Sequence, residues 1–273
     1  MGYNSKEILL QVTDLVAGYD GKVILKDVNF TEKDVARTGI DSTGQIIAFI
    51  GRSGRGKSTL FKTLTGLIRP IQGQMLINEL VIDDPAKAKL LREGDIGFVD
   101  QKYTLFRHKT ITQICEYALR KSTLSKAEKD AIITESLTEW GLIEHKDKYS
   151  CELSGGQRQR TAIIEQILAN KHFMIFDEPF SGLDVGNIEK VKESFAKIGQ
   201  SDERNTIIFS THDLRLAVEM ADSIYIVGFP EGTTEYSTIV KHYDLKELGL
   251  AWKQYGEGHR QLVADIKELL LRS

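Results

Sequence analysis

A glycine-rich loop between an apolar run and a helical pattern constrains the fold of this chain most. Residues 51–59 read Gly-Arg-Ser-Gly-Arg-Gly-Lys-Ser-Thr, which fits the pattern G-x-x-x-x-G-K-[ST]. The run before it, 46–50 (IIAFI), is typical of a strand buried on both faces. The pattern after it predicts a helix over 59–68, with Pro70 marking its end. Strand, glycine loop and helix in this order predict a phosphate-binding loop.

The chemistry of phosphate explains the loop's composition. Glycines let the backbone curl so that its N–H groups converge on one anion, and the positive end of the next helix faces the same point. We expect Lys57 to reach the β- and γ-phosphates of a nucleotide and the Ser58 hydroxyl to ligate Mg²⁺. The expected nucleotide contacts are Gly51, Arg52, Ser53, Gly54, Arg55, Gly56, Lys57, Ser58 and Thr59. This motif alone does not choose between kinases, GTPases and ATPases.

Short apolar runs elsewhere predict an α/β fold. Runs at 173–176, 206–210 and 223–227 alternate with helical patterns at 188–198 and 214–221. That alternation predicts a mainly parallel sheet flanked by helices. Together with the phosphate-binding loop, this arrangement resembles the RecA-like fold of P-loop NTPases. The early strands are expected to form an antiparallel β subdomain. The polar stretch between these strands and the run 46–50 is interpreted as a loop or a hairpin. Those early strands are predicted at 8–15 and 23–30, further short strands at 75–77 and 96–99, and the polar stretch spans 32–45.

Helical spacing dominates the middle of the chain. We expect a helical subdomain over about 102–165, inserted in the α/β core, with one amphipathic helix over 125–140. Ile132, Ile133, Leu137 and Trp140 form the apolar face of that helix. The main domain is predicted to span 1–232, and a short extension, 233–273, to end in a helix over 260–271.

Composition excludes several classes of protein. The formal net charge of −3 gives no indication of a nucleic-acid partner. No apolar run is long enough to span a membrane, and the N-terminus lacks the pattern of a signal peptide. The two cysteines, Cys115 and Cys151, are expected to be buried, reduced thiols, which is typical of the cytoplasm.

A second glycine motif points to a family. Leu153-Ser154-Gly155-Gly156-Gln157, followed by Arg158-Gln159-Arg160, resembles the signature sequence of ATP-binding cassette (ABC) ATPases, and the resemblance covers nearly the whole chain. By itself, Ser154 before a helix is equally compatible with a simple N-cap. The resemblance implies that Ser154, Gly155, Gly156 and Gln157 complete the ATP site of a second copy.

Two carboxylates follow a predicted strand about twenty residues later. The segment 172–179 (HFMIFDEP) resembles the second nucleotide-binding motif of P-loop ATPases. Asp177 is then expected to hold Mg²⁺, through water, and Glu178 to polarise the attacking water as general base. An exposed acidic pair at the end of a strand is the alternative interpretation.

Several further residues have expected roles that come only from the resemblance. His212 resembles the family's switch histidine near the γ-phosphate, and Gln101 resembles the glutamine that joins Mg²⁺ or water to the helical subdomain. Tyr19 lies where the family has an aromatic ring stacked on adenine, with Tyr3 as a second candidate. Ser181-Gly182-Leu183-Asp184 resembles the loop that crosses the dimer interface, although most members have Ala in place of Gly182.

The resemblance implies an ATP hydrolase that powers a membrane transporter. The expected assembly is an ATP-sandwiched homodimer on a transmembrane permease, at the cytoplasmic face of the inner membrane, with a possible periplasmic binding protein. Residues 102–113, with Leu105 and Phe106 as candidate contacts, are expected to form part of the permease groove. The motifs look most like importer ATPases of the nitrate/sulfonate/taurine type. The alternatives are an ATPase of a lipid or drug exporter and a soluble ABC ATPase of iron–sulfur cluster assembly.

Overall fold

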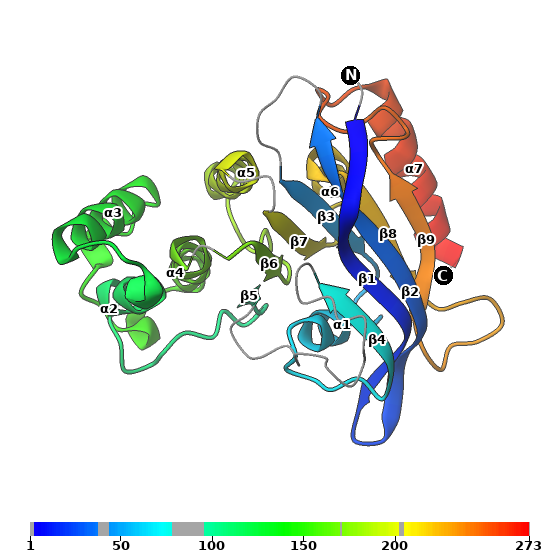
Figure 1. Cartoon of the computed structure of the whole chain (residues 1–273), viewed down its shortest axis with the longest axis horizontal. Coiled ribbons are helices and arrows are strands. Elements are labelled where there is room, and N and C mark those ends of the chain that lie inside the picture. Colours follow the sequence, from blue (N-terminus) through cyan, green and yellow to red (C-terminus); the bar gives the residue numbers. More distant parts are fainter. Residues whose placement is uncertain (1–2, 38–43, 78–95, 170, 202–204, 273) are drawn as a thin grey trace.

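The main sheet has six strands, and the glycine loop follows the carboxyl end of one of its inner strands, β3. In the computed structural model, residues 3–37, 44–77, 96–169, 171–201 and 205–272 are described (Figure 1). The strand order is β5-β6-β7-β3-β8-β9, and every neighbouring pair is parallel except β8 and β9. The expected mainly parallel sheet is therefore confirmed. The strands span Gln45–Ile50 (β3), Gly97–Val99 (β5), Phe173–Phe176 (β6), Thr206–Thr211 (β7), Ser223–Gly228 (β8) and Thr238–Asp244 (β9).

A smaller antiparallel sheet covers one side of the main sheet. Its order is β2-β1-β4, with β1 at Tyr3–Tyr19, β2 at Lys22–Arg37 and β4 at Gln72–Ile77. Asp20 and Gly21 both have positive φ, 48° and 78°, which is the two-residue turn that joins twisted strands tightly. Of the two interpretations of the stretch from residue 32, loop or hairpin, the structure shows the hairpin as far as Arg37, because β2 continues to pair with β1 there; residues 38–43 lie outside the described part.

Alternation along β3 explains how the two halves of the core form. Ile47 and Phe49 point into a cluster shared with β1, β2 and the helix α1 (Lys57–Leu64), whereas Ala48 and Ile50 point into the cluster under the other helices. All four side chains are at most 1% exposed. The glycine loop that follows β3 is thus fixed on a strand buried on both faces.

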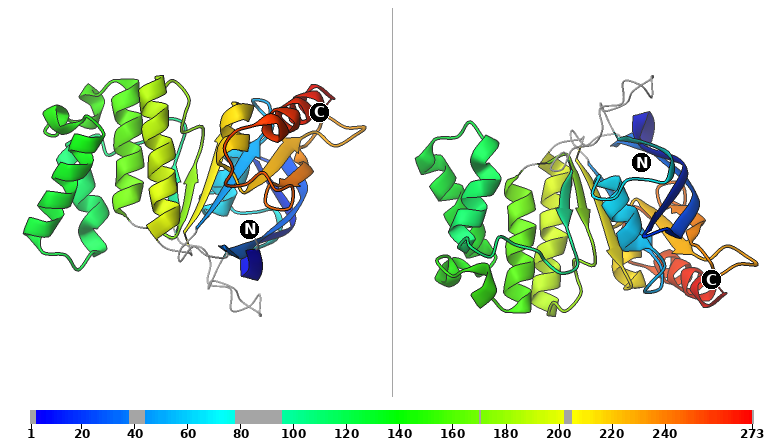
Figure 2. Two further views of the ribbon diagram at one scale, coloured as in Figure 1. Left: turned by 90° about the horizontal axis from the view of Figure 1, so that it is seen from above. Right: turned by 90° about the horizontal axis from the view of Figure 1, so that it is seen from below.

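The chain between β5 and β6 is helical where it was expected to be. It contains α2 (Ile111–Ala118), α3 (Lys126–Glu139) and α4 (Gly155–Leu168), with short 3₁₀ turns at Leu119–Lys121, Ile143–His145 and Ser150–Glu152. α3 begins after a capping box between Ser125 and Glu128. Figure 2 shows α4 lying beside α5 (Val185–Ser201), so that α2 and α3 stand at the end of the molecule away from β1 and β2.

Some expected boundaries were wrong. α1 ends at Leu64 rather than at residue 68, because the Thr65 hydroxyl donates to the carbonyl of Phe61 and Gly66 turns away with φ 75°. Cys115 is buried as expected, but Cys151 is exposed.

The segment after β8 remains attached to the main domain through one strand and one helix. β9 pairs with β8, and α7 (Glu257–Arg272) packs on α6 (Leu214–Met220). No helix among the described residues is long and apolar enough to span a bilayer.

Candidate functional site

The glycine loop forms the floor of the site at the carboxyl end of β3. Gly51 must lack a side chain, because a Cβ there would lie 2.4 Å from the carbonyl oxygen of Val227. Gly56, with φ 87°, is the N-cap of α1. Nζ of Lys57 donates to the carbonyl oxygens of Gly51, at 2.6 Å, and Arg52, at 3.4 Å. Burial lowers the pKa of Lys57, and the carboxylates of Glu178 and Asp177 oppose that effect.

One hollow of about 410 Å³ collects the residues predicted for the nucleotide and metal. All nine residues of the loop, 51–59, line it together with Tyr19, Gln101, Asp177, Glu178 and His212. Ile24 and Ser181 complete its wall. Tyr19, 42% exposed, reaches it from the end of β1; the side chain of Tyr3 lies outside the described part. The structure therefore brings together side chains separated by almost two hundred residues.

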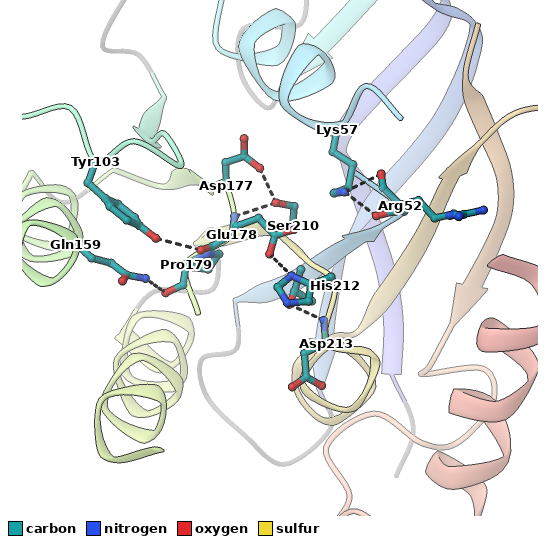
Figure 3. A network of polar contacts seen from close by, with 12 residues as sticks. Arg52, Lys57, Tyr103, Gln159, Asp177, Glu178, Pro179, Ser210, His212 and Asp213 are labelled. Carbon is teal, nitrogen blue, oxygen red and sulfur yellow. Dashed lines mark hydrogen bonds and ion pairs between the residues drawn. The ribbon is translucent and has the colours of Figure 1, made fainter. Parts of the chain in front are cut away.

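Asp177 and Glu178 at the end of β6 are held by the neighbouring strand. The Ser210 hydroxyl, at the end of β7, donates to Oδ1 of Asp177 at 2.6 Å and accepts the backbone N–H of Glu178 at 2.9 Å (Figure 3). Asp177 is 1% exposed, and its Oδ2 has no hydrogen-bond partner among the described residues. An unpartnered buried carboxylate oxygen beside a hydroxyl-lined hollow suits a hard cation.

Glu178 and His212 meet across the mouth of the hollow. Nδ1 of His212 lies 2.9 Å from Oε2 of Glu178, and the histidine side chain is 74% exposed whereas the glutamate side chain is 12% exposed. This placement contradicts the alternative interpretation of a fully exposed acidic pair. It also leaves the free face of Glu178 directed to the space lined by the glycine loop.

The second glycine motif lies apart from this hollow. Ser154 caps α4, its hydroxyl accepting from the backbone N–H of Gln157 while Gln157 Oε1 accepts the N–H of Ser154. None of the residues Ser154, Gly155, Gly156 and Gln157 lines the hollow. A Cβ on Gly155 or Gly156 would meet no described atom within 4 Å. The capping interpretation is therefore confirmed, and this chain alone does not combine the two motifs.

Three residues of the site were not predicted. Ser210 joins the Asp177 carboxylate to the backbone N–H of Glu178, Tyr103 donates its hydroxyl to the carbonyl of Glu178 at 3.2 Å, and buried Gln159 donates to the carbonyl of Pro179. Each of these side chains contacts a group that is distant in the sequence, so sequence spacing carries no signal of the contact. The position of Tyr103 two residues after Gln101 is the nearest available clue.

Comparison with known proteins gives the family. A family model described as ABC transporter matches residues 41–181, just over half of the chain. The chain belongs to this family. Within it, the chain is 34% identical over 187 residues to the sulfate/thiosulfate import ATP-binding protein CysA of Thermosynechococcus vestitus, covering 68% of this chain and 54% of that protein. It is 31% identical over 230 residues to the nitrate import ATP-binding protein NrtD of Synechocystis, covering 83% and 80%.

Solved structures of family members share the fold. CbiO1 of Clostridium perfringens, described as part of the ABC transporter complex cbiONQ, is 26% identical with a TM-score of 0.66 over 98% of this chain and 97% of that one. Among the curated relatives, this chain spans about half the length of the CysA proteins of Thermosynechococcus vestitus and Agrobacterium fabrum. The expected ABC ATPase fold is confirmed over both sheets and the helical region.

Proposed function

We propose that this chain is the ATP-binding and ATP-hydrolysing subunit of an ABC transporter that imports a small solute. The observation that carries the proposal is the single hollow lined by the glycine loop, Asp177, Glu178 and His212. Phosphoryl transfer needs a phosphate cradle, a place for a divalent cation and a group that orients water, and the hollow presents residues suited to each. The names of CysA and NrtD, both import ATP-binding proteins, support the direction of transport.

The residues of the hollow divide the chemistry between them. The backbone N–H groups of 51–56 and the amino end of α1 bind the phosphates, and Lys57 exchanges its contacts with loop carbonyls for phosphate oxygens. Glu178 accepts a proton from the water that attacks the γ-phosphate, and the bond from the γ-phosphorus to ADP breaks, giving ADP and phosphate. His212, in contact with Glu178, orients that carboxylate and faces the γ-phosphate. Tyr19 stacks on the adenine ring.

The donor set fits Mg²⁺. The Ser58 hydroxyl, the unpartnered oxygen of Asp177 and the Gln101 amide line the same hollow and offer oxygen ligands. No group of three or more His, Cys, Asp or Glu side chains arranged to hold a metal occurs within the described ranges, so phosphate and water oxygens must complete the coordination. When bound, the ion neutralises charge on the phosphate oxygens.

A second copy of the chain completes the site. The segment Ser154–Gln157 is surface-accessible at the amino end of α4, where backbone N–H groups favour an anion. The open space around Gly155 and Gly156 lets another molecule approach the backbone closely. We infer that these residues bind the γ-phosphate held by the glycine loop of the partner copy, so that ATP joins two chains.

A membrane permease is the proposed mechanical partner, at the cytoplasmic face of the inner membrane. A second hollow of about 410 Å³ lies between residues 98–106 and α4. Phe106, 38% exposed, is available for contact there, whereas Leu105 is buried. Gln101 lies within the segment 98–106 and also lines the hollow proposed for ATP, so this segment connects the two hollows. The import names of CysA and NrtD favour this proposal over export of lipids or drugs and over iron–sulfur cluster assembly.

Two substitutions test the proposed site. Glu178→Gln removes the proton acceptor, so ATP turnover measured by phosphate release is expected to fall by about 100-fold or more. ATP affinity, measured by calorimetry, is expected to stay within about threefold of the wild-type value because the phosphate contacts remain.

Lys57→Ala is the matched control, since it removes a phosphate contact and is expected to weaken ATP binding itself. Undiminished turnover by Glu178→Gln would overturn the assignment of the base. Unchanged ATP affinity of Lys57→Ala would overturn the assignment of the glycine loop.

A further inference from the structure

Tyr103 connects the segment after Gln101 to the backbone of Glu178. It lies between β5 and α2, has φ 49°, and is partly buried. Its own N–H donates to the carbonyl of Asp100 at 2.8 Å, which turns the chain back. Its hydroxyl then reaches the carbonyl oxygen of Glu178 at 3.2 Å (Figure 3).

The backbone of Glu178 needs such support. Its φ is 54°, the left-handed region that residues with a side chain seldom occupy. The N–H of Glu178 is held by Ser210, and its carbonyl accepts from both Tyr103 and the N–H of Ser181, each at 3.2 Å. These contacts fix both peptide groups of Glu178, and hence the direction in which its carboxylate leaves the backbone.

We propose that Tyr103 is a positioning residue that holds the Glu178 peptide in its left-handed conformation and so ties the aim of the catalytic carboxylate to the segment 100–106. This inference rests on the proposed role of Glu178 in ATP hydrolysis.

The surroundings of Tyr103 suit this role. The Tyr103 phenol lies in a half-buried position, where burial, with a contribution from the negative charges of Glu178 and Asp177, raises its pKa to about 12. The same side chain lines the hollow formed with Phe98, Phe106 and Glu165. A partner that shifts the segment 100–106 would therefore also move the hydroxyl that restrains Glu178.

Tyr103→Phe tests the hydroxyl alone, because it keeps the ring, and the backbone N–H of Ser181 still donates to the Glu178 carbonyl. We expect kcat for ATP to fall about three- to tenfold, as for loss of one hydrogen bond that orders the reacting group, with ATP affinity unchanged. Tyr149→Phe, on an exposed tyrosine of the helical region, is the control and is expected to leave both values unchanged. A Tyr103→Phe variant with wild-type kcat, or with ATP affinity weakened in parallel with kcat, would overturn the proposal.

A second readout does not depend on activity. Amide hydrogen exchange, followed by mass spectrometry on peptides spanning 177–183, is expected to speed up in Tyr103→Phe and not in Tyr149→Phe. Unchanged exchange in that segment would contradict the restraint even if the thermal midpoint fell. If the wild-type chain did not hydrolyse ATP, the proposed function would fail, and the exchange result would still decide whether Tyr103 restrains Glu178.

Discussion

Asp177 and Glu178 are neighbours in the chain but differ in their surroundings. Asp177 continues the direction of β6, is 1% exposed and is tied to Ser210. The left-handed backbone of Glu178 turns its carboxylate toward the more exposed His212. The proposed metal ligand and the proposed base can thus follow each other directly, because one unusual φ angle separates their environments.

Glu165 on α4 allows a prediction about pH. Burial raises its pKa to about 7 from the ordinary 4.5, with nearby Arg120 opposing that rise. The folded state therefore holds this proton more tightly than the unfolded state, and stability falls as pH increases from about 4.5 to 7. We expect Glu165→Gln to remove this loss, so its thermal midpoint relative to wild type should rise between pH 5 and pH 7 and then level off.

The control for this prediction is Glu116→Gln, on an exposed position of α2. Its midpoint relative to wild type is expected to stay level over the same range. A constant difference for Glu165→Gln across pH 5 to 8 would show that Glu165 titrates normally in the folded protein.

At the level of residues, the sequence predicts side chains that belong to known motifs, but it does not predict side chains whose role depends on contacts with distant residues. Lys57 was predicted from the spacing of the glycine loop, and Asp177 and His212 from the resemblance to known ATPases; the structure places all three around one hollow. Tyr103 and Ser210 act on backbone groups of Glu178 from positions 75 and 32 residues away. No local pattern encodes such a contact, because it arises only when the strands have assembled.

At the level of elements, one buried hydrogen bond joins the two sheets. The Tyr225 hydroxyl on β8 donates to Oε1 of Glu32 on β2 at 2.7 Å, and Glu32 is 3% exposed. Burial and the charge of Glu32 both raise the pKa of Tyr225. His242 stacks on the Tyr225 ring, but its Nε2 is 3.8 Å from Glu32, too far for a hydrogen bond.

Tyr225→Phe is expected to destabilise the fold by about 1–3 kcal/mol, because it leaves a buried carboxylate without its short hydrogen bond. Urea unfolding measures this loss. Tyr117→Phe, at an exposed position on α2, is the control and should change stability by less than about 0.5 kcal/mol. Equal stability of the Tyr225 variant and wild type would mean that the Glu32 contact contributes nothing net.

Strand β9 shows why some elements escape prediction. Residues 238–244 (TIVKHYD) mix apolar and charged side chains, and none of them is fully buried. An edge strand packs on one neighbour, so it needs no continuous apolar run. The buried strands β3, β6 and β7 were predicted because their apolar runs have no other explanation. The expected boundary at residue 232 falls just before β9, which pairs with β8; the division into 1–232 and 233–273 stays a prediction.

At the level of the whole molecule, the two glycine motifs occupy different parts of the chain. The loop 51–59 lies on the main sheet, whereas Ser154–Gln157 opens α4 in the helical region. In the proposed composite site a second copy supplies the missing motif, and ATP is then a ligand that favours the paired state. Hydrolysis removes that preference, which is how the proposed cycle would drive a permease.

The molar mass of Glu178→Gln in solution, measured by light scattering with and without Mg²⁺ and ATP, tests this account most directly. We predict the mass of one chain without ATP and of two chains with it, because the variant binds ATP without consuming it. Adding Ser154→Arg, which places a bulky cation at the amino end of α4, should keep the mass at one chain while ATP still binds. A Glu178→Gln chain that binds ATP with wild-type affinity yet stays at the mass of one chain would contradict the composite site.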